Sequence, residues 1–136
     1  KSFAVEIQAI PAVHNFIKSS LSKYSICPES VTDFIIACDE IASNIVEHGY
    51  ASAPATKGIS PKFVLTIHYI PGRVTATFFD SGAAFNPKDA MEPDIQKNLR
   101  GEKKGGYGLF LIRKLVDKIV YSARRRLNVT RLVKQT

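Results

Sequence analysis

The sequence predicts an α+β fold, a two-layer α/β sandwich in which about three helices cover one face of a mixed, mostly antiparallel sheet. Segments with strand-like and helix-like periodicity follow one another in the order strand, helix, helix, strand, strand, loop, helix, strand, strand. The apolar fraction of 45% and the charged fraction of 23% are typical of a chain that buries a core. Because the chain has 136 residues and no internal repeat, we expect residues 1–136 to form a single domain.

Residues 1–50 are predicted to contain a short strand and two helices. The strand is indicated by apolar residues that alternate with other residues: Phe3, Val5 and Ile7. Pro11 is expected to open the first helix, whose apolar positions extend to Tyr24. The second helix is expected from near Pro28 to Gly49. Its apolar stripe has a 3.6-residue period and predicts a buried face: Val31, Phe34, Ile35, Cys38, Ile41, Ala42 and Ile45.

The rest of the chain is predicted to contribute two strand pairs and a third helix. Residues 63–70 and 74–79 form the first pair around a Pro-Gly turn, and residues 118–122 and 128–134 form the second around three arginines. Between the pairs, residues 80–107 are rich in Gly, Pro, Lys and Asp, which is typical of a lid or a binding loop. The third helix is indicated by apolar residues at helical spacing: Leu109, Ile112, Leu115, Val116 and Ile119.

The formal net charge of +7 is unevenly distributed along the chain. Residues 1–60 carry four Lys and Arg against six Asp and Glu, whereas residues 61–136 carry fifteen against six. A basic half attracts an anionic partner, which could be a nucleic acid, the phosphates of a nucleotide or an acidic protein. No helix-turn-helix, zinc-finger or aromatic RNA-binding pattern is present, so we expect no direct binding to nucleic acid.

The sequence shows no sign of a membrane span, a signal peptide or a metal-binding cysteine cluster. No apolar run approaches the roughly 20 residues that cross a bilayer, and we therefore expect a cytoplasmic protein that does not associate with membranes. The missing initiator Met indicates a trimmed chain or a piece of a longer protein. Cys27 and Cys38 have no His or Cys at metal-ligand spacing, so both are expected to be reduced, with Cys38 in the core.

A second stripe of the helix at residues 28–49 carries polar groups that could do chemistry. A stripe of this kind is usually a solvated face, but Glu40 is bordered by apolar residues, and small side chains leave room for a ligand beside it and Asn44. An amide oxygen can bind Mg²⁺, and a carboxylate can accept a proton. The stripe consists of Asp33, Ala37, Glu40, Asn44, Glu47 and His48.

Two further segments could bind a ligand. Asp80-Ser81-Gly82 follows an apolar strand, where the Asp can accept a hydrogen bond from an exocyclic amine; an ordinary turn is the structural alternative. Gly105-Gly106-Tyr107-Gly108 precedes an apolar helix, and Lys103 and Lys104 add positive charge before it. Backbone N–H groups at such a helix start can hold phosphate, and a glycine-rich hinge is the alternative.

Taken in order, these three segments resemble the N, G1 and G2 boxes of the GHKL ATPase superfamily, which includes gyrase- and MutL-type ATPases, histidine kinases and anti-sigma-factor serine kinases. Residues 39–50 are most similar to the Glu-x-x-x-Asn-x-x-x-His-x-Tyr run of the anti-sigma-factor serine/threonine kinases. Residues 80–87 and 106–112 resemble that branch's Asp-x-Gly-x-x-Phe-Asp-Pro and Gly-x-Gly-Leu-x-Leu-Ile. Residues 128–134 match its final strand, Asn-x-Val-x-Leu-x-Lys, with Thr130 in place of Val. The resemblance covers nearly the whole chain and implies the Bergerat fold.

The resemblance implies an ATP- and Mg²⁺-dependent protein serine/threonine kinase. Glu40 would accept the proton of the attacking hydroxyl, and Asn44 would ligate Mg²⁺. Asp80 would read adenine, and Gly82 would line the base pocket. The remaining nucleotide contacts would come from the loop and the helix after it, with the three glycines on the phosphates: Phe85, Lys104, Gly105, Gly106, Gly108 and Leu109.

The partners implied by the resemblance are a sigma factor, an anti-anti-sigma protein as substrate and a second copy of the domain as a homodimer. Three positions depart from the family patterns: Ala84 and Leu127, where Gly is common, and Asn86, where Asp is usual. These departures affect the expectation of catalytic turnover more than that of nucleotide binding.

The same superfamily offers three other functions. The ATP-binding domain of a histidine kinase would seldom carry a Glu at position 40, and the His-bearing helical hairpin is missing. A catalytically weak module that binds ATP and sequesters a sigma factor is compatible with the sequence. A hydrolysing gyrase- or MutL-type ATPase would need a transducer domain for which 136 residues leave no room.

Overall fold

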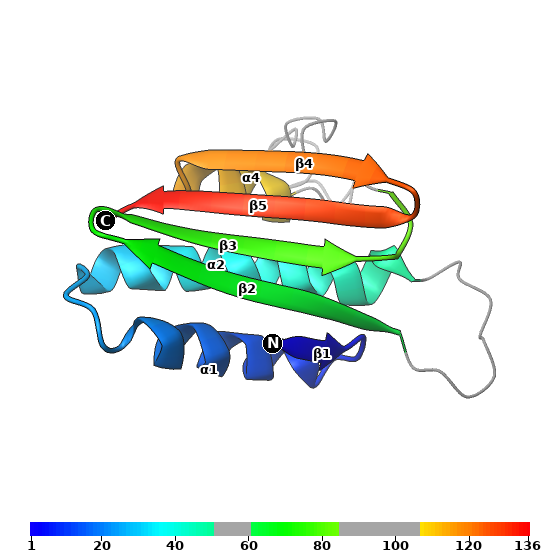
Figure 1. Cartoon of the computed structure of the whole chain (residues 1–136), viewed down its shortest axis with the longest axis horizontal. Coiled ribbons are helices and arrows are strands. Elements are labelled where there is room, and N and C mark those ends of the chain that lie inside the picture. The colour runs from blue at the N-terminus through cyan, green and yellow to red at the C-terminus, as the bar shows by residue number, and fades with distance from the viewer. Residues whose placement is uncertain (51–60, 85–106) are drawn as a thin grey trace, which may run out of the picture.

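A computed structural model describes residues 1–50, 61–84 and 107–136, which form a five-stranded sheet with helices on one face (Figure 1). The strands are β1 (Ser2–Ala4), β2 (Lys62–Ile70), β3 (Arg73–Asp80), β4 (Lys118–Arg124) and β5 (Leu127–Gln135). Their order across the sheet is β1-β2-β3-β5-β4, and each of these pairings is antiparallel. The α+β class predicted from the sequence is confirmed.

The helices are α1 (Ala9–Leu21), α2 (Pro28–Asn44), a π-helical segment η1 (Ile45–Gly49) that continues α2, and α4 (Tyr107–Leu115). Pro28 begins α2, where its missing N–H costs nothing, and Glu29 lies in the first turn near the positive end of the helix dipole. The helical segment therefore runs from Pro28 to Gly49, as predicted. Among the described residues, no helix has both the length and the apolar character that a membrane crossing requires.

The core lies between α2 and the inner face of the sheet. The predicted stripe of α2 is buried except for the partly buried Val31, and it packs with the inward side chains of the strands: Phe63, Leu65, Val74, Ala76, Phe78 and Leu132. Cys38 belongs to this core, and burial raises the pKa of its thiol, whereas Cys27 is exposed; both are free. The core position predicted for Cys38 is confirmed.

The N-terminal elements differ from their predicted limits. The strand predicted through Ile7 is wrong, because β1 ends at Ala4 and Ile7 is 72% exposed. The chain turns there, since the N–H of Glu6 donates to the carbonyl of Ala4 and the N–H of Ala9 to that of Glu6. The first helix begins at Ala9 and ends at Leu21. Tyr24, predicted on that helix, lies beyond its end and stacks on Tyr69, with ring centroids 4.2 Å apart.

Lys134 of β5 joins three elements at the end of the sheet near the β2–β3 turn. Its ammonium group donates to Asp33 of α2 at 3.0 Å and to the carbonyl of Leu115, the last residue of α4, at 2.8 Å. A cation at a helix C-terminus is favourable because the carbonyls there carry partial negative charge. The same lysine therefore holds α2 and α4 against the sheet.

The turn between β4 and β5 has an unusual backbone for its residues. Arg125 and Arg126 have φ angles of 48° and 67°, both in the left-handed region. Two-residue hairpin loops with positive φ at both positions normally carry Asn-Gly, because a Cβ in this region is crowded.

We expect Arg125→Asn combined with Arg126→Gly to stabilise the protein, since the new residues adopt these angles at lower cost. The free energy of unfolding, measured by urea titration, should rise by about 1 kcal/mol. Arg124→Asn is the control, because Arg124 lies within β4 and this change removes a charge without changing the turn. An unchanged or lower value for the double variant would contradict the strain at this turn.

Candidate functional site

A cavity of about 230 Å³ lies between the end of α2, the segment η1 and the adjoining ends of β3 and β5. Its apolar walls come from Ile41, Ile45, Ala83 and Ala84. Polar side chains from separate elements line the same cavity: Asn44, His48, Asp80, Tyr121, Asn128 and Thr130. An apolar hollow with a few convergent polar groups is the usual form of a small-molecule site.

Asp80 and Asn128 form the polar centre of this cavity. They lie opposite each other in the register of β3 and β5 and are only 7% and 4% exposed. The Asn128 amide donates to Asp80 Oδ1 at 3.0 Å, and the N–H of Gly82 donates to the same oxygen at 2.9 Å. Asn128 also accepts from the Tyr121 hydroxyl at 3.1 Å. Both contacts to Asp80 use Oδ1, so within the described residues Oδ2 keeps its capacity to accept from a ligand.

The turn after Asp80 packs directly on the end of the helical segment. A Cβ added to Gly82 would overlap the backbone of Gly49, which shows that the two backbones touch. The N–H of Ala83 donates to the carbonyl of Gly49 at 2.6 Å, and the N–H of Ser81 donates to the Tyr50 hydroxyl at 2.9 Å. Burial raises the pKa of Tyr50, so its hydroxyl stays neutral at physiological pH. The turn that carries Asp80 is thus held by the last residues of the long helical segment.

Glu40 faces the start of α4. A Cβ at Gly108, in the first turn of α4, would overlap the Glu40 carboxylate, so a side chain at position 108 would displace that carboxylate. Burial raises the pKa of the Glu40 carboxyl above its ordinary value of 4.5, and the negative charge of Glu47 raises it further. A raised pKa brings a carboxylate closer to the range in which a general base is effective.

Asn44 lies one helical turn beyond Glu40 and lines the cavity. Its amide nitrogen is buried and has no hydrogen-bond partner among the residues that the structure describes. An unpaired buried donor is unfavourable, so the side chain is held in the cavity wall at a cost that a ligand can offset. Among the described residues, no group of three or more His, Cys, Asp or Glu side chains could enclose a metal ion. The amide oxygen of Asn44 is of the kind that Mg²⁺ accepts, so this residue fits as one ligand of a Mg²⁺ whose other ligands would be phosphate oxygens and water.

The structure brings together the predicted residues that it describes. Asn44 and Asp80 line one cavity, and Glu40 meets Gly108 beside it. Gly82 does not line the cavity, but its backbone contacts Gly49, which does. Leu109 is 7% exposed and belongs to the core. The remaining predicted residues lie outside the described part of the chain: Phe85, Lys104, Gly105 and Gly106.

Sequence reasoning gave no role to three residues that shape the cavity. In the sequence, Asn128 belongs only to a strand pattern, Tyr50 only to the helix motif, and His48 to that motif and to the polar stripe. The signal that could have found Asn128 is the strand register, because pairing β3 with β5 puts it opposite Asp80. The contact of Tyr50 with Ser81 joins residues 31 positions apart and has no local signature.

Comparison with known proteins identifies a matching family and similar sequences. The sequence pattern of the histidine kinase-like ATPase domain matches residues 3–134. The serine/threonine-protein kinase BtrW of Bordetella bronchiseptica is 30% identical over 89 residues, which are 65% of this chain and 59% of that protein. The serine-protein kinase RsbW of Halalkalibacterium halodurans is 32% identical over 95 residues, 67% of this chain and 54% of that protein. The chain thus spans little more than half the length of these relatives.

A solved structure shows the same fold. The structure of the RsbU and RsbW domains of Rv1364c from Mycobacterium tuberculosis superposes with a TM-score of 0.61, over 98% of this chain and 31% of that one. The sequence identity is 18%, so this likeness concerns the fold.

We expect Gly82→Ala to lower the free energy of unfolding by about 1–3 kcal/mol, because the new Cβ forces two backbones apart. Gly49→Ala is a matched control at the same contact, since its Cβ would meet only Ile45 at an ordinary 3.9 Å. Urea titration of both variants checks this. Equal losses for the two alanines would contradict the close approach at Gly82.

Proposed function

The chain belongs to the histidine kinase-like ATPase domain family, and from this membership we propose that it is an ATP-dependent protein serine/threonine kinase of the anti-sigma-factor type. The observation that carries the proposal is the meeting of Glu40 with Gly108, one helical turn from Asn44. A base, a metal ligand and a helix start are the parts that phosphoryl transfer to a hydroxyl needs. The two kinases similar to this chain support the same activity.

In the proposed reaction, Glu40 takes the proton of a serine or threonine hydroxyl on a partner protein. The hydroxyl oxygen forms a bond to the γ-phosphorus of ATP, and the bond from that phosphorus to the β–γ bridging oxygen breaks, which leaves ADP. The backbone at the start of α4, where Gly108 has no side chain, offers N–H groups and the positive end of a helix dipole to the phosphates. Mg²⁺ held by Asn44 would neutralise phosphate charge when bound.

We assign recognition of the adenine ring of ATP to Asp80. Its Oδ2 can accept from the exocyclic amine of adenine, while Asn128 and Gly82 hold the other oxygen. Guanine presents a carbonyl oxygen at the corresponding position, and two facing acceptors are unfavourable. The arrangement therefore supports a preference for ATP over GTP.

The partners remain those that the family resemblance implies. We infer that the kinase binds a sigma factor, phosphorylates an anti-anti-sigma protein and acts as a homodimer in the cytoplasm. The acceptor residue separates this proposal from a histidine kinase domain, because phosphoserine and phosphothreonine survive acid whereas phosphohistidine does not.

We expect Glu40→Gln to lower the rate of phosphoryl transfer at least about 100-fold, because the amide cannot accept the proton. Transfer is measured with labelled ATP and an anti-anti-sigma protein from the same genome, and the labelled product should survive acid. Glu47→Gln is the matched control on the same helical segment. The Glu47 side chain is 57% exposed and belongs to η1, which follows α2. Transfer by Glu40→Gln at the wild-type rate would exclude Glu40 as the base.

The pH dependence of the reaction should report the raised pKa of Glu40. The base is active only when deprotonated, so the rate should fall on the acid side of a pH that lies above the ordinary value of 4.5. Glu47→Gln removes a negative charge that raises this pKa, and the acid limb should therefore move to lower pH. The pH profile of kcat/KM for both proteins checks the shift. A shift to higher pH would contradict the coupling of the two carboxylates.

Nucleotide binding can be tested separately from transfer. ATP with Mg²⁺ should raise the melting temperature by a few degrees through ligand linkage, and GTP should raise it less. Asp80→Asn should reduce the difference, because an amide can also donate to the carbonyl of guanine. Equal stabilisation of the wild-type protein by ATP and GTP would rule out the assigned role of Asp80.

A further inference from the structure

The face of the sheet opposite the helices is left uncovered by the described residues. Figure 1 shows α2 and α4 behind the strands, and the side turned to the viewer is formed by β2, β3, β5 and β4. The cavity with Asp80 lies on the helix side. We use the name outer face for the uncovered side of these four strands.

The register of the strands determines which side chains the outer face carries. Phe78 and Leu132 point into the core, and side chains alternate along a strand, so their neighbours in sequence point outward. One row across the sheet consists of Val64, Phe79, Val129 and Ser122, and the next consists of Thr66, Thr77, Arg131 and Val120. A third row consists of His68, Thr75, Val133 and Lys118.

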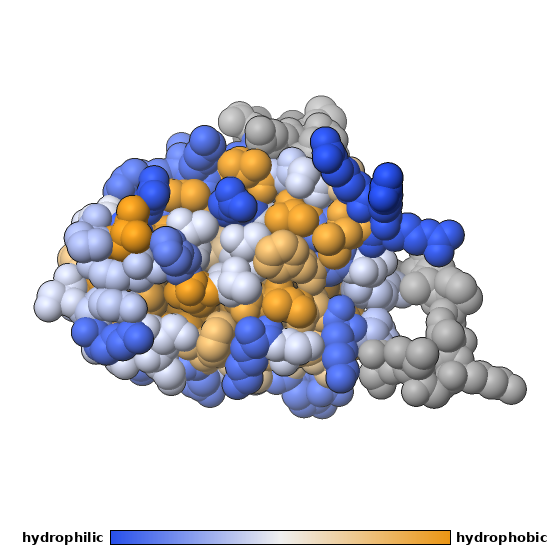
Figure 2. Space-filling view, viewed as in Figure 1, coloured by the Kyte–Doolittle hydropathy of each residue, from blue (hydrophilic) through white to orange (hydrophobic). Residues whose placement is uncertain are grey.

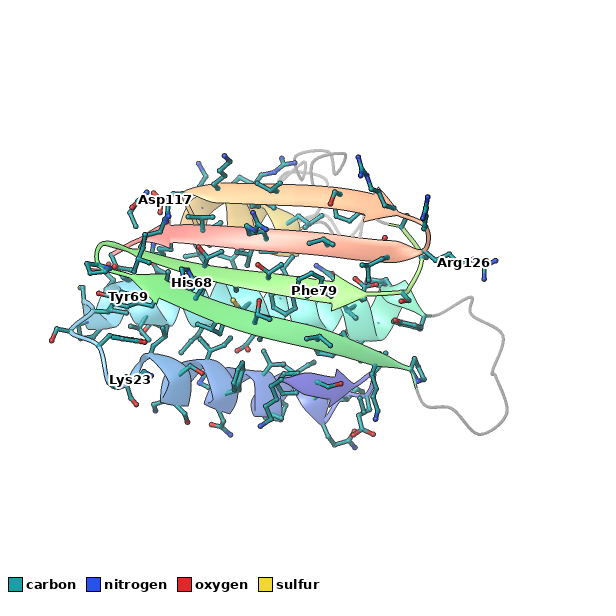
Figure 3. All side chains as sticks on the ribbon, in the orientation of Figure 1. Lys23, His68, Tyr69, Phe79, Asp117 and Arg126 are labelled. Atoms are coloured by element: carbon teal, nitrogen blue, oxygen red, sulfur yellow. The ribbon has the colours of Figure 1, made fainter. Side chains whose placement is uncertain are left out.

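The outer face is more apolar than a solvated sheet face. Val64, Ile70 and Leu127 are 39%, 37% and 44% exposed, and they occupy outward positions together with Phe79 and several valines. Figure 2 shows apolar residues interspersed with polar ones over this face and hydrophilic residues along its edges, and Figure 3 marks Phe79 on β3 and His68 on β2. Antiparallel sheets that face water on one side normally alternate with polar residues there. An apolar cluster with a polar rim is typical of an interaction surface.

The strands of the outer face contribute cations and no outward-pointing carboxylate. The four strands contain one carboxylate, Asp80, and its side chain points to the helix side. Arg73, Lys118 and Arg131 line a shallow hollow of about 620 Å³ on the outer face. Asp117, which precedes β4 and borders the hollow, accepts a hydrogen bond from the N–H of Gln135 at 2.7 Å. Among the described residues, no ion pair joins a carboxylate to these three cations.

We propose that the outer face binds an acidic, amphipathic segment of a partner protein. Four strands about 4.8 Å apart give a surface roughly 15 Å wide, which accommodates an α-helix about 10 Å across. Its apolar side would lie on Val64, Phe79 and Leu127, and its carboxylates would pair with Arg131 and Lys118. Packing a helix on this face would give the sheet the cover that it has on its other side.

Two other occupants fit the outer face less well. A second copy in a two-fold interface would bring together two surfaces of the same positive charge, which would repel. Single-stranded nucleic acid is held by stacking on several aromatic side chains, whereas the three rows offer only Phe79, which is half-buried, and His68, which lies two rows away from it. Since the cavity is on the opposite side, occupation of the outer face leaves nucleotide binding unaffected, and the proposal does not depend on kinase activity.

The experiment uses a labelled amphipathic peptide of about 20 residues, with leucine at helical spacing and glutamate elsewhere, and a second peptide with lysine for glutamate. Fluorescence anisotropy with the full chain should show binding of the glutamate peptide but not of the lysine peptide. This binding should be weaker at about 300 mM salt than at about 50 mM salt. Arg131→Glu with Lys118→Glu should weaken binding at least about tenfold, and so should Leu127→Ser. The control, Lys18→Glu with Lys23→Glu, makes the same charge change near α1 and should leave binding within about twofold.

Other outcomes overturn the proposal. Equal losses in the control and the outer-face variants would show a non-specific charge effect. Tighter binding of a single-stranded oligonucleotide that Arg131→Glu abolishes, or a dimer in sedimentation that Leu127→Ser dissociates, would assign the outer face to another occupant. The increase in melting temperature with ATP, measured on every variant, should match the wild-type increase. If ATP gave no increase even in the wild-type protein, the proposed kinase function would fail while the peptide result still decided this inference.

Discussion

The contact of two backbones at Gly49 and Gly82 is the constraint on which the candidate site depends. Gly49 ends the helical segment that carries Glu40 and Asn44, and Gly82 lies in the turn that carries Asp80. The 2.6 Å hydrogen bond from Ala83 to Gly49 closes this contact, and the bond from Ser81 to Tyr50 reinforces it. Because Gly82 has no side chain, the turn that carries Asp80 can contact the backbone at the end of the helical segment that carries Glu40 and Asn44.

The surroundings of Asp80 and Glu40 differ, and each has a chemical consequence. Asp80 has one oxygen occupied by Asn128 and Gly82, which orients the other oxygen before any ligand arrives. Glu40 lies where burial and Glu47 both disfavour its charged form. That cost to the folded protein is the kind that functional sites retain, since a base with a raised pKa binds a proton more strongly.

The two faces of the sheet have different surroundings. On the inner face, α2 and α4 are held by Lys134, which contacts Asp33 and the end of α4 far from the cavity. This anchor fixes the helix whose start contains Gly108. On the outer face, Arg73, Lys118 and Arg131 lie beside exposed apolar side chains. A partner could therefore be held on one side of the sheet while a nucleotide occupies the other.

Local patterns in the sequence were sufficient for the helices of the core and for most of the strands. The stripe from Val31 to Ile45, with Pro28 before it and Gly49 after it, predicted the long helical segment, because periodicity and end signals act over a few residues. The same holds for the order of Glu40, Asn44, Asp80 and Gly108, from which the resemblance to the family followed. The early end of β1 was missed because turn hydrogen bonds near Glu6 outweigh a weak alternation.

The sequence by itself determined the fold class, the family and the residues with a capacity for chemistry. Only the tertiary structure decided that Gly82 is needed for a backbone contact, that Asn128 holds Asp80 and that an apolar, basic face is left uncovered. Asn128 and Asp80 are 48 positions apart in the chain. Contacts over such a separation depend on strand register and on close packing, and neither leaves a periodic pattern in the segments that take part.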